Sequence, residues 1–350
     1  MTSESTGQPV QFGISLPNRA VLFGLSPDVL LETAERAEAS GFFDSVWVGD
    51  NLLSKPRLES VVTLAALAAR TRRLKLGEVC LASFPLRHPL ILAIQWASLD
   101  LISAGRTILA VCIGGSATMG PQFAAELAAM GVHTNERVAR LEEGIHLLRA
   151  FWGSEPVSHR GRFYAFDQVQ ALPKPVQKRI PIIIASNPKT DGDPAVEERV
   201  LRRIARLGDG WQTDGTPAAV FRDRWSRIRE YAAEAGRAAE VTDASLHMMV
   251  NINPDEAQAR RESVEFLDRY YGTGVIAPSK IADWLAAGSP AAVADKIVTF
   301  IEAGCTTPIL RFTSPDQHGQ LAQFLERVAP QLEGFRGRAA ARASVASRGR

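Results

Sequence analysis

Short apolar runs alternate with longer amphipathic segments along most of the chain, and this alternation limits its possible folds more than any other feature. Eight of the runs are candidate strands: residues 12–16, 45–49, 74–82, 107–113, 181–185, 209–213, 246–252 and 308–312. Most are almost continuously apolar, which is typical of strands that are covered on both faces. Two fit less well, because 209–213 is short and polar and 246–252 contains a histidine and an asparagine.

The segments between these runs carry apolar residues at helical spacing. Within 136–152, Val138, Leu141 and Ile145 step by three and four, which places them in one stripe along a helix. Four helix starts are marked by a capping side chain that precedes a proline at the first helical position: Ser26-Pro27, Thr216-Pro217, Asn253-Pro254 and Ser289-Pro290.

Eight strands alternating with helices are compatible with an open doubly wound sheet or with a closed barrel. The count favours the barrel, and the segment after the first run, SLPNRAV, lacks the glycine-rich fingerprint of a Rossmann domain. We therefore predict an α/β fold, a single (β/α)8 TIM barrel over residues 10–335. An insertion at about 114–180, between strands 4 and 5, is expected to pack over the catalytic end. Residues 1–9 and 336–350 are predicted to be disordered.

The charge balance gives no sign of a nucleic-acid partner. The net charge is +2, but residues 336–350 contain five arginines and no acid, so the slight basicity belongs to the C-terminal tail. The N-terminus lacks the basic start and apolar run of a signal peptide, and no apolar stretch reaches the roughly 18 residues that span a membrane. These features predict a cytoplasmic protein with no membrane partner.

The chain has three cysteines, Cys80, Cys112 and Cys305. The first two fall inside apolar runs, and no pair has CxxC spacing. Buried, reduced thiols are therefore the expected state. No group of cysteines and histidines has the spacing of a zinc site, so we predict no metal.

The active site of such a barrel lies at the carboxyl ends of the strands, so the residues just after each run are the candidates. They are rich in amides, hydroxyls and small side chains: Asn18, Asp50, Asn51, Ser83, His88, Gly114, Gly115, Ser186, Asn187, Gln212, Thr213, Asn253, Thr313 and Ser314. This set suits hydrogen bonding to a large planar cofactor better than metal-assisted hydrolysis or a nucleophilic triad. The residues alone name no reaction.

Several longer segments resemble the bacterial luciferase-like flavin monooxygenase family. They occur in family order and cover about residues 10–330: GFFDSVWVGDN (41–51), LESVVTLAALAARTRRLKLG (58–77), LRHPLILAIQWASLDLISAGRTILAVCIGG (86–115), ERVARLEEGIHLLRAFW (136–152), LPKPVQKRIPIIIAS (172–186), GDGW (208–211) and GSPAAVADKI (288–297). The resemblance implies a (β/α) barrel whose cavity binds the ring of reduced FMN or of a 5-deazaflavin coenzyme. It also implies the absence of a metal, a separate flavin reductase as the partner of FMN-dependent members, and a homodimer.

The resemblance assigns cofactor contacts to the ends of the third and fourth strands. Ala82 and Ser83 lie where the third strand passes the flavin ring, often through a strained peptide that presses the backbone against the ring. Gly114 and Gly115 lie where the fourth strand ends beside the ring, and glycines allow a close approach of the backbone to a ligand.

The resemblance also places a phosphate-binding loop after the fifth strand, at Ser186 and Asn187. This loop departs from the family pattern, because it carries one compensating cation, Lys189, and several acids. These charges repel a phosphate unless they point away: Asp191, Asp193, Glu197 and Glu198.

Asp50 and Asn51 end the second strand and are the candidate catalytic pair. Many deazaflavin-dependent relatives have histidine at the second position, where it faces the reacting ring. An amide does not titrate at neutral pH, so Asn51 cannot serve as a general base, and this counts against hydride transfer that needs one. His88 is the nearest replacement in the sequence, although RHP at this helix start is common in the family and a structural role is expected.

Two further residues have two interpretations each. Arg137 forms ion pairs along the helix 136–152 or reaches the cofactor. Trp211, in the family signature GDGW, belongs to the core or to the wall of the cofactor cavity.

The leading functional prediction is a monooxygenase that uses reduced FMN and O₂ on a small organic substrate. The first alternative is a deazaflavin-dependent reductase or dehydrogenase on the same fold, and Asn51 favours the FMN enzyme over it. The second alternative is a flavin-binding protein without catalysis.

Overall fold

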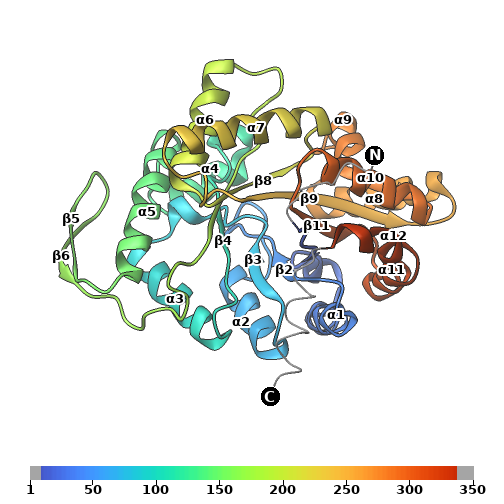
Figure 1. The fold of residues 1–350 in the computed structure, drawn as a ribbon, viewed down its shortest axis with the longest axis horizontal. Coiled ribbons are helices and arrows are strands. Elements are labelled where there is room, and N and C mark those ends of the chain that lie inside the picture. The colour runs from blue at the N-terminus through green and yellow to red at the C-terminus, as the bar shows by residue number, and fades with distance from the viewer. Residues whose placement is uncertain (1–8, 337–350) are drawn as a thin grey trace, which may run out of the picture.

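Parallel strands form a closed barrel at the centre of the molecule (Figure 1). The structure, a computed structural model, describes residues 9–336. The strands lie in the order β3-β2-β1-β11-β9-β8-β7-β4. Their bounds are Gly13–Leu16 (β1), Ser45–Val48 (β2), Lys75–Glu78 (β3), Leu109–Val111 (β4), Ile182–Ala185 (β7), Gly210–Asp214 (β8), Asp243–Ile252 (β9) and Thr307–Phe312 (β11). Each strand overlaps one of the apolar runs, which confirms the strands predicted from the sequence.

The barrel closes between β3 and β4. Two isolated parallel bridges join these strands, one from Leu76 to Thr107 and one from Leu81 to Val111. The backbone N–H of Ile108 donates to the carbonyl of Leu76 at 2.8 Å. The predicted TIM barrel is therefore confirmed. The third predicted strand, 74–82, is too long, because the chain bends after Glu78 and regains only a single bridge at Leu81.

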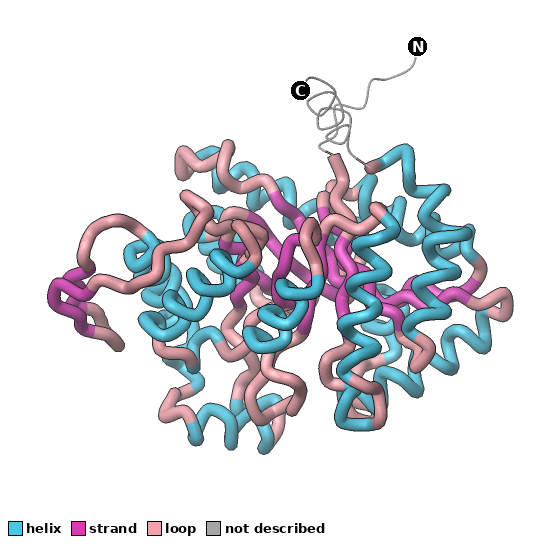
Figure 2. The backbone as a smooth tube through the Cα atoms, turned by 90° about the horizontal axis from the view of Figure 1, so that it is seen from below, coloured by secondary structure: helices cyan, strands magenta, loops and turns pink. Residues whose placement is uncertain are grey.

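Helices surround the strands on the outside of the barrel (Figures 1 and 2). They are Pro27–Ser40 (α1), Ser60–Arg70 (α2), Pro89–Ile102 (α3), Pro121–Ala129 (α4), Arg137–Trp152 (α5), Pro194–Leu207 (α6), Ala218–Glu234 (α7), Glu256–Tyr271 (α8), Pro278–Trp284 (α9), Pro290–Glu302 (α10), Gln317–Gln323 (α11) and Ala329–Leu332 (α12). A π-helical turn, Phe324–Val328, separates the last two, and short 3-10 turns occur at Ala20–Phe23, Phe84–Leu86, Ala117–Met119, Thr134–Glu136 and Glu333–Phe335.

Two of the four predicted helix starts are confirmed. Ser26 and Ser289 cap α1 and α10 by accepting a backbone N–H, with proline at the next position. The other two helices begin later than predicted. Thr216 instead bonds within the loop after β8, and α8 is capped by Asp255, whose carboxylate accepts the N–H of Gln258.

Three short strands were not predicted from the sequence: β5 (Val157–Arg160) and β6 (Ala165–Val169), which form a hairpin outside the barrel, and β10. Strand β10 (Leu285–Gly288) pairs in parallel with residues 249–252 of β9. Strand β9 reaches well past the end of β8, whose pairing stops at His247 of β9. The segment WLAAG covers the edge that this leaves, although it is too short and too small in side chains to stand out from the helices beside it.

The insertion divides into two parts with different positions. Glu126 of α4 accepts the backbone N–H groups of Leu52, Leu53 and Ser54, so α4 packs on the loop after β2 at the carboxyl end of the barrel. The hairpin formed by β5 (Val157–Arg160) and β6 (Ala165–Val169) instead projects from the side of the molecule beside α5 (Figures 1 and 2). The prediction that the insertion packs over the catalytic end therefore holds for α4 and fails for the hairpin.

A separate apolar cluster fills the inside of the barrel. It consists of Trp47, Ala110, Ile183 and Ile309. Glycine is needed opposite the indole of Trp47, since a Cβ atom at Gly13 would lie 2.5 Å from it. Trp47 is 1% exposed and its indole N–H donates to Ser45, so the interior is packed below the strand ends, as in other barrels of this type.

The two ends of the described chain meet. Val10 and Arg336 form a parallel bridge, and the N–H of Val10 donates to the carbonyl of Phe335. Arg336 was predicted to belong to a disordered tail and is instead held against the barrel. The remainder of the two predicted disordered termini, 1–8 and 337–350, lies outside the described residues.

Candidate active site

Asp50 lies at the end of β2 and is saturated with hydrogen bonds. Its carboxylate accepts the N–H and the hydroxyl of Ser83 at 2.8 and 2.6 Å, the hydroxyl of Ser60 at 2.9 Å and the guanidinium of Arg87 at 3.2 Å. The residue is 4% exposed. Asp50 therefore fixes the end of β2 to the end of β3, and the catalytic role predicted from the sequence stays a prediction.

Glu78, the last residue of β3, was not a candidate and proves to be unusual. It is fully buried, and neither carboxylate oxygen has a hydrogen-bond partner among the described residues. Burial, and secondarily the charge of Asp50, raises the pKa of Glu78 well above its ordinary value. Arg87, whose charge opposes this shift, is already paired with Asp50 and Glu59, so Glu78 has no ion-pair partner among the described residues.

Asn51 faces the loop that follows β2. Its side-chain oxygen accepts the guanidinium of Arg57 at 3.3 Å. Arg57 in turn approaches the hydroxyl of Tyr270, on α8, at 3.5 Å. The structure thus brings Asn51 together with two residues that the sequence analysis did not single out.

The ends of β3 and β4 touch each other where the cofactor ring was predicted. A Cβ atom at Gly114 would lie 2.3 Å from the carbonyl oxygen of Ala82, and Gly114 has a left-handed φ of +66°. Glycine is needed here for contact between two strand ends. The backbone at Ala82 and Ser83 shows neither a cis peptide nor a positive φ, so the predicted strained peptide is absent there.

Gly115 and Arg137 complete this part of the site. A Cβ atom at Gly115 would lie 2.0 Å from the ring of Phe123 on α4, so Gly115 allows the insertion to approach β4. Arg137 donates to the carbonyls of Ile113 and Gly114 at 3.1 and 2.8 Å, and no carboxylate pairs with it in the described part of the chain. Of its two interpretations, the ion pair along the helix is wrong.

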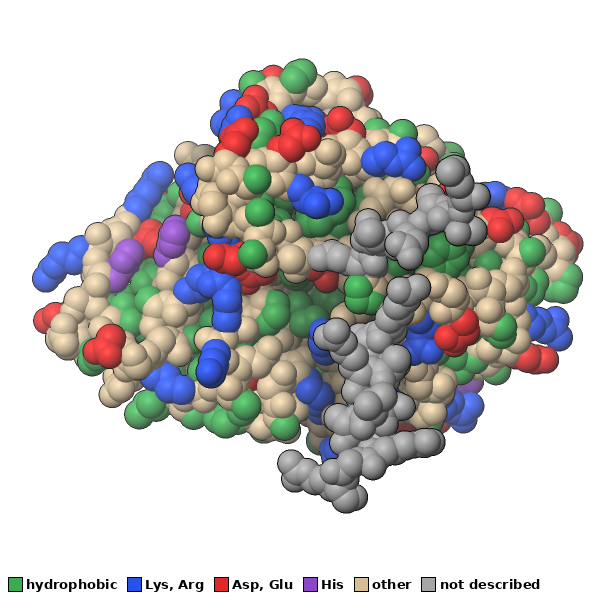
Figure 3. Space-filling model, in the orientation of Figure 1, with side chains coloured by type: hydrophobic (Ala, Val, Ile, Leu, Met, Phe, Trp, Pro, Cys, Tyr) green, Lys and Arg blue, Asp and Glu red, His purple; other side chains and the backbone are tan. Residues whose placement is uncertain are grey.

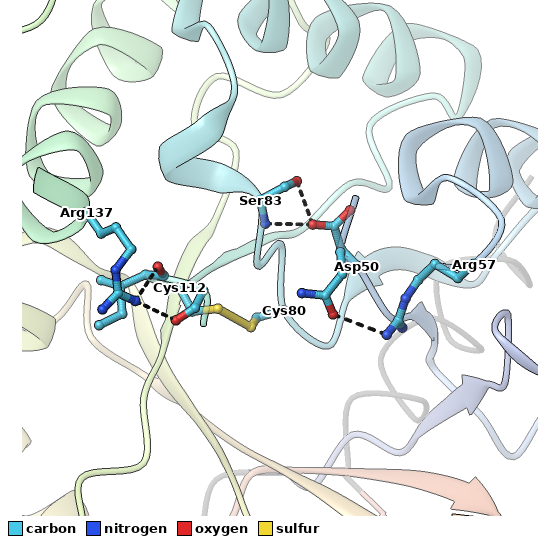
Figure 4. The surroundings of a disulfide bond; sticks show 9 residues. Asp50, Arg57, Cys80, Ser83, Cys112 and Arg137 are labelled. Atoms are coloured by element: carbon cyan, nitrogen blue, oxygen red, sulfur yellow. Dashed lines mark hydrogen bonds between the residues drawn. A yellow bond between two sulfur atoms is a disulfide. The ribbon is translucent and has the colours of Figure 1, made fainter. Parts of the chain in front are cut away.

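Cys80 and Cys112 form a disulfide at these same strand ends (Figure 4). The prediction of reduced thiols is wrong for this pair and holds for Cys305, which is free and buried. The reason is topological. Residues 80 and 112 follow β3 and β4, which are distant in the sequence but become neighbours when the barrel closes, with Cα atoms 6.1 Å apart.

The loop after β7 is bonded to itself and to its neighbours. The side-chain amide of Asn187 donates to Asp214 and accepts from Thr216 and from Arg224. The backbone of Ser186 accepts the indole N–H of Trp211 at 2.9 Å. Asn187 thus has little hydrogen-bonding capacity left for a phosphate.

Three of the four acids of this loop and of the start of α6 are already bonded, since Glu198 also pairs with Arg202. Asp193 caps α6 by accepting the N–H of Ala195, so the helix N-terminus already holds an anion. Glu197 pairs with Arg224 at 2.6 Å and with Arg227 at 2.6 Å. Alternating acidic and basic side chains cover α6 and α7 at the top of Figure 3, in agreement with these pairs.

His88 and Trp211 lie in packing positions. His88 is exposed, and its ring packs edge-on against Tyr164 and Phe166 of the hairpin region, at 5.4 and 5.8 Å between centroids. Trp211 is fully buried between β8 and α7, with its ring stacked on Phe221 at 4.9 Å. These contacts agree with a structural role for both residues, and their predicted catalytic and cofactor-binding roles stay predictions.

A cluster of positive charges lies on the other side of the barrel end. It consists of Arg19, Lys55, Arg57, Lys280 and Arg311, and we call it the cationic cluster. Its members are all partly or fully buried. Within the described residues, the only ion pair of the cluster is that of Lys280 with Asp214, at 3.1 Å. Like charges at such proximity destabilise one another unless an anion joins them.

The cationic cluster perturbs the groups around it. Burial, assisted by the charges of Arg57 and Arg19, lowers the pKa of Lys55 to about 8. Burial alone would raise the pKa of Tyr270, but the charges of Arg311 and Arg57 outweigh it and the pKa is lowered. Such perturbed groups gather at functional sites in proteins.

Unpartnered polar atoms occur within the cluster, beside it and on β8. His247 Nε2 and Gln212 Nε2 are buried and have no hydrogen-bond partner in the described chain, and the same holds for Arg19 Nη1. Burial, followed by the charges of Arg311 and Lys280, lowers the pKa of His247 well below its ordinary value. Buried polar atoms without partners are rare in folded proteins, so these atoms are candidates for hydrogen bonds to a ligand.

The sequence contained a signal for part of this cluster. His247 and Arg311 interrupt strand-like apolar runs, and His247 was in one of the two runs that fitted poorly. Arg311 is 2% exposed and donates to the hydroxyl of Ser15 at 2.7 Å. A charged or polar residue within a buried strand faces the barrel interior and was the available clue. Lys55 and Tyr270 carried no comparable signal, because a loop and a distant helix bring them together.

A family model described as luciferase-like monooxygenase matches residues 10–307 of the chain. The chain belongs to this family. Membership confirms the resemblance inferred from the sequence and makes the chain an oxidoreductase. In the described residues no group of three or more potential ligand side chains is placed to hold a metal ion, and no helix is long and apolar enough to cross a membrane.

The curated relatives of this family member include F420-dependent enzymes. An F420-dependent glucose-6-phosphate dehydrogenase of Kineococcus radiotolerans is 27% identical, over 94% of this chain and 99% of that protein. The enzyme of the same name from Amycolatopsis mediterranei is 28% identical, over 87% of this chain and 95% of its own.

Solved structures share the fold of this family member. An F420-dependent secondary alcohol dehydrogenase in complex with an F420-acetone adduct superposes with a TM-score of 0.76 at 21% identity, covering 93% of this chain and 100% of that one. The monooxygenase RslO1 from Streptomyces bottropensis superposes with a TM-score of 0.74 at 24% identity, covering 91% and 99%.

Proposed function

We propose that the protein is an F420-dependent oxidoreductase that oxidises or reduces an anionic small molecule. The observation that carries the proposal is the cationic cluster, which holds five positive side chains and one carboxylate contact at the carboxyl end of the barrel. This charge balance suits a phosphate or carboxylate on the substrate or on the cofactor. The relatives named above support the deazaflavin alternative better than the FMN monooxygenase that the sequence analysis placed first.

The residues present fit a deazaflavin at this end of the barrel. The unpartnered atoms of Gln212 and His247 provide hydrogen-bonding groups at the strand ends, and the cationic cluster provides charge for a phosphate. The loop after β7 fits the phosphate less well, because Asn187 is bonded within the protein and Asp193 occupies the start of α6. We therefore assign the anionic part of the ligand to the cationic cluster.

A bound deazaflavin supplies hydride transfer, and the protein must then handle the proton of the substrate hydroxyl. Asn51 cannot accept it. Lys55 follows in the same loop, and its pKa of about 8 leaves about a tenth of the amine neutral at pH 7. We assign the proton to Lys55, because burial has already weakened its charged form.

The surrounding residues orient and shield this group. The Nζ atom of Lys55 lies 4.8 Å from the ring centre of Tyr271 and 5.6 Å from that of Phe123, on the insertion helix α4. Arg57 bonds to Asn51 and so fixes the residue that replaces the histidine of other members. The aromatic rings exclude water from the amine, which is the condition that keeps its pKa low.

Binding of reduced F420 and of reduced FMN, measured anaerobically and side by side, tests the cofactor. Tight binding of F420 with weak binding of FMN is the expected result. Turnover of F420 with glucose 6-phosphate and with a neutral secondary alcohol then tests the substrate class. Preference for the neutral alcohol would contradict the anionic substrate, and tight binding of FMN alone would contradict the proposal as a whole.

A matched pair of variants tests the cluster. Lys280→Gln is expected to weaken binding of the anionic substrate at least tenfold, because it removes one charge-assisted contact. Lys178→Gln is the control, since Lys178 is exposed and precedes β7 at the opposite end of the barrel. Equal effects of the two substitutions would show that the net charge, and not the cluster, attracts the anion.

A further inference from the structure

In the described barrel, the seam between β3 and β4 is the junction without a run of consecutive paired positions. Strands β9 and β11 pair over six consecutive positions. Strands β3 and β4 share no such ladder and meet at two isolated bridges, Leu76 with Thr107 and Leu81 with Val111. The strand order runs from β3 around to β4, so this seam is where the sheet closes on itself.

The disulfide between Cys80 and Cys112 crosses this seam at its carboxyl end. Cys80 directly precedes Leu81 and Cys112 directly follows Val111, so both half-cystines adjoin the second bridge. The covalent bond therefore supplements the missing ladder at the end of the barrel where the candidate site lies.

The two half-cystines and the third cysteine differ in exposure. Cys80 and Cys112 are partly exposed, whereas Cys305 is 2% exposed and burial raises the pKa of its thiol. Accessible disulfides are the ones that thiols reduce readily. Arg137 bonds the carbonyls of the two residues that follow Cys112 (Figure 4), and a nearby positive charge favours a thiolate leaving group.

The segments that continue from the disulfide border the candidate site. Ala82 lies two residues after Cys80 and Gly114 two residues after Cys112, and these two backbones are in contact. Gly115 lets α4 approach through Phe123. Reduction of the disulfide would thus remove a covalent link next to the contacts among β3, β4 and helix α4 of the insertion.

We propose that Cys80 and Cys112 form a reversible dithiol–disulfide switch that controls the order of residues 112–120. A thiolate of a dithiol reductant attacks one Sγ atom, forms a mixed disulfide and releases the other cysteine as a thiolate, which takes up a proton. The second thiol of the reductant then attacks the mixed disulfide and releases the remaining cysteine. Two electrons pass from the dithiol to the protein, and the reductant leaves as a disulfide.

Thiol labelling of the native protein tests whether the site is reducible. The full chain is incubated with dithiothreitol without denaturant, trapped with iodoacetamide and weighed intact. Two added groups are expected, on Cys80 and Cys112, with Cys305 unlabelled because it is buried. Absence of labelling in the native protein would overturn the proposal, since the bond would then be an inert structural link.

Hydrogen exchange tests whether reduction changes the protein. The exchange rate of residues 112–120 is expected to rise at least tenfold on reduction and to return on reoxidation, while the hairpin at 157–169 stays unchanged. Loss of a cross-link that spans 32 residues is expected to lower the melting temperature by about 5 °C. Labelling without any change in exchange at 112–120 would also overturn the proposal.

Substitutions separate the switch from a general effect of the reductant. Cys80→Ser and Cys112→Ser are expected to show the faster exchange without dithiothreitol and to ignore its addition. Cys305→Ser is the control and should respond as the wild type does, which would hold even if the other two variants failed to fold. No step of the test needs a cofactor, so its outcome is independent of the proposed F420 chemistry.

Discussion

The two sides of the barrel end treat their polar groups in opposite ways. Around the ends of β2 and β3, both carboxylate oxygens of Asp50 accept hydrogen bonds, and Arg87 is paired with Asp50 and Glu59. Around the end of β11, Arg311 and its neighbours carry unneutralised positive charge, and Gln212 and His247 have unpartnered atoms. Asp50 thus has its hydrogen bonds made without a ligand, whereas the cationic cluster lacks enough acids to balance it; Glu78 is the exception on the first side, because its carboxylate oxygens have no partner among the described residues. Residues that support the site and residues that are open to a ligand therefore differ in how many of their hydrogen bonds and ion pairs are already made within the protein.

The largest expected effect comes from breaking the saturated side. Asp50→Ala removes the partner of Ser83 and leaves Arg87 without its buried counter-ion, so the free energy of unfolding should fall by about 3–5 kcal/mol. Urea unfolding measures the change. Asp295→Ala, at an exposed position on α10, is the control and should change it by less than about 0.5 kcal/mol. A loss of activity with unchanged stability would restore Asp50 as a catalytic residue.

The second largest effect is expected from removing one charge from the cationic cluster. The pKa of Lys55 is lowered from 10.5 to about 8, so below pH 8 the protonated amine destabilises the folded state relative to the unfolded state. Lys55→Met should therefore raise the free energy of unfolding by about 2–3 kcal/mol at pH 7. The gain should shrink as the pH rises from about 8 to 10.5, where wild-type Lys55 becomes neutral in the folded and then in the unfolded state.

Unfolding of both proteins across this pH range measures the linkage, with Lys178→Met as the control. A gain that is constant with pH would mean that methionine packs better and that the charge is not responsible. The same variant should lose turnover if Lys55 handles the proton.

A smaller effect is expected at two buried glutamines that differ in their hydrogen bonds. Gln212 is buried with an unpartnered amide nitrogen, whereas the amide of Gln320 bonds both the N–H and the carbonyl of Ile252. Gln212→Leu should raise the free energy of unfolding by about 1 kcal/mol, and Gln320→Leu should lower it by about 1–3 kcal/mol. The first should also weaken ligand binding. If both substitutions lowered the free energy of unfolding, Gln212 would have a hydrogen-bond partner after all, and the expected difference between the two glutamines would be wrong.

The smallest effect concerns His88. Its ring contacts Tyr164 and Phe166 on the protein surface, so His88→Ala should lower the free energy of unfolding by at most about 1 kcal/mol and leave turnover within twofold. Steady-state kinetics and urea unfolding together check this. A tenfold loss of turnover at unchanged stability would instead support the catalytic role for which His88 was a candidate from the sequence.

The fold was readable from the sequence, and the site only in part. Strands and helices follow from the local spacing of apolar residues, so the eight runs sufficed for the barrel. Strand ends such as Asp50 and Ser83 were found by their position, but their contact with each other depends on the neighbours of β2 in space. Tyr270 reaches Arg57 across more than 200 residues, and no local pattern records this. The disulfide was missed for the same reason.

Glu126 has a consequence beyond the stability of the insertion. One carboxylate accepts three successive backbone N–H groups, from Leu52 to Ser54, in the loop that also carries Asn51 and Lys55. The inserted helix α4 and this loop therefore behave as one rigid piece. A change in the length or sequence of the insertion is therefore expected to shift the loop that carries Lys55 while the strands stay in place. Chains of this architecture can in this way acquire new substrates by exchanging an outer segment, with the barrel itself inherited intact.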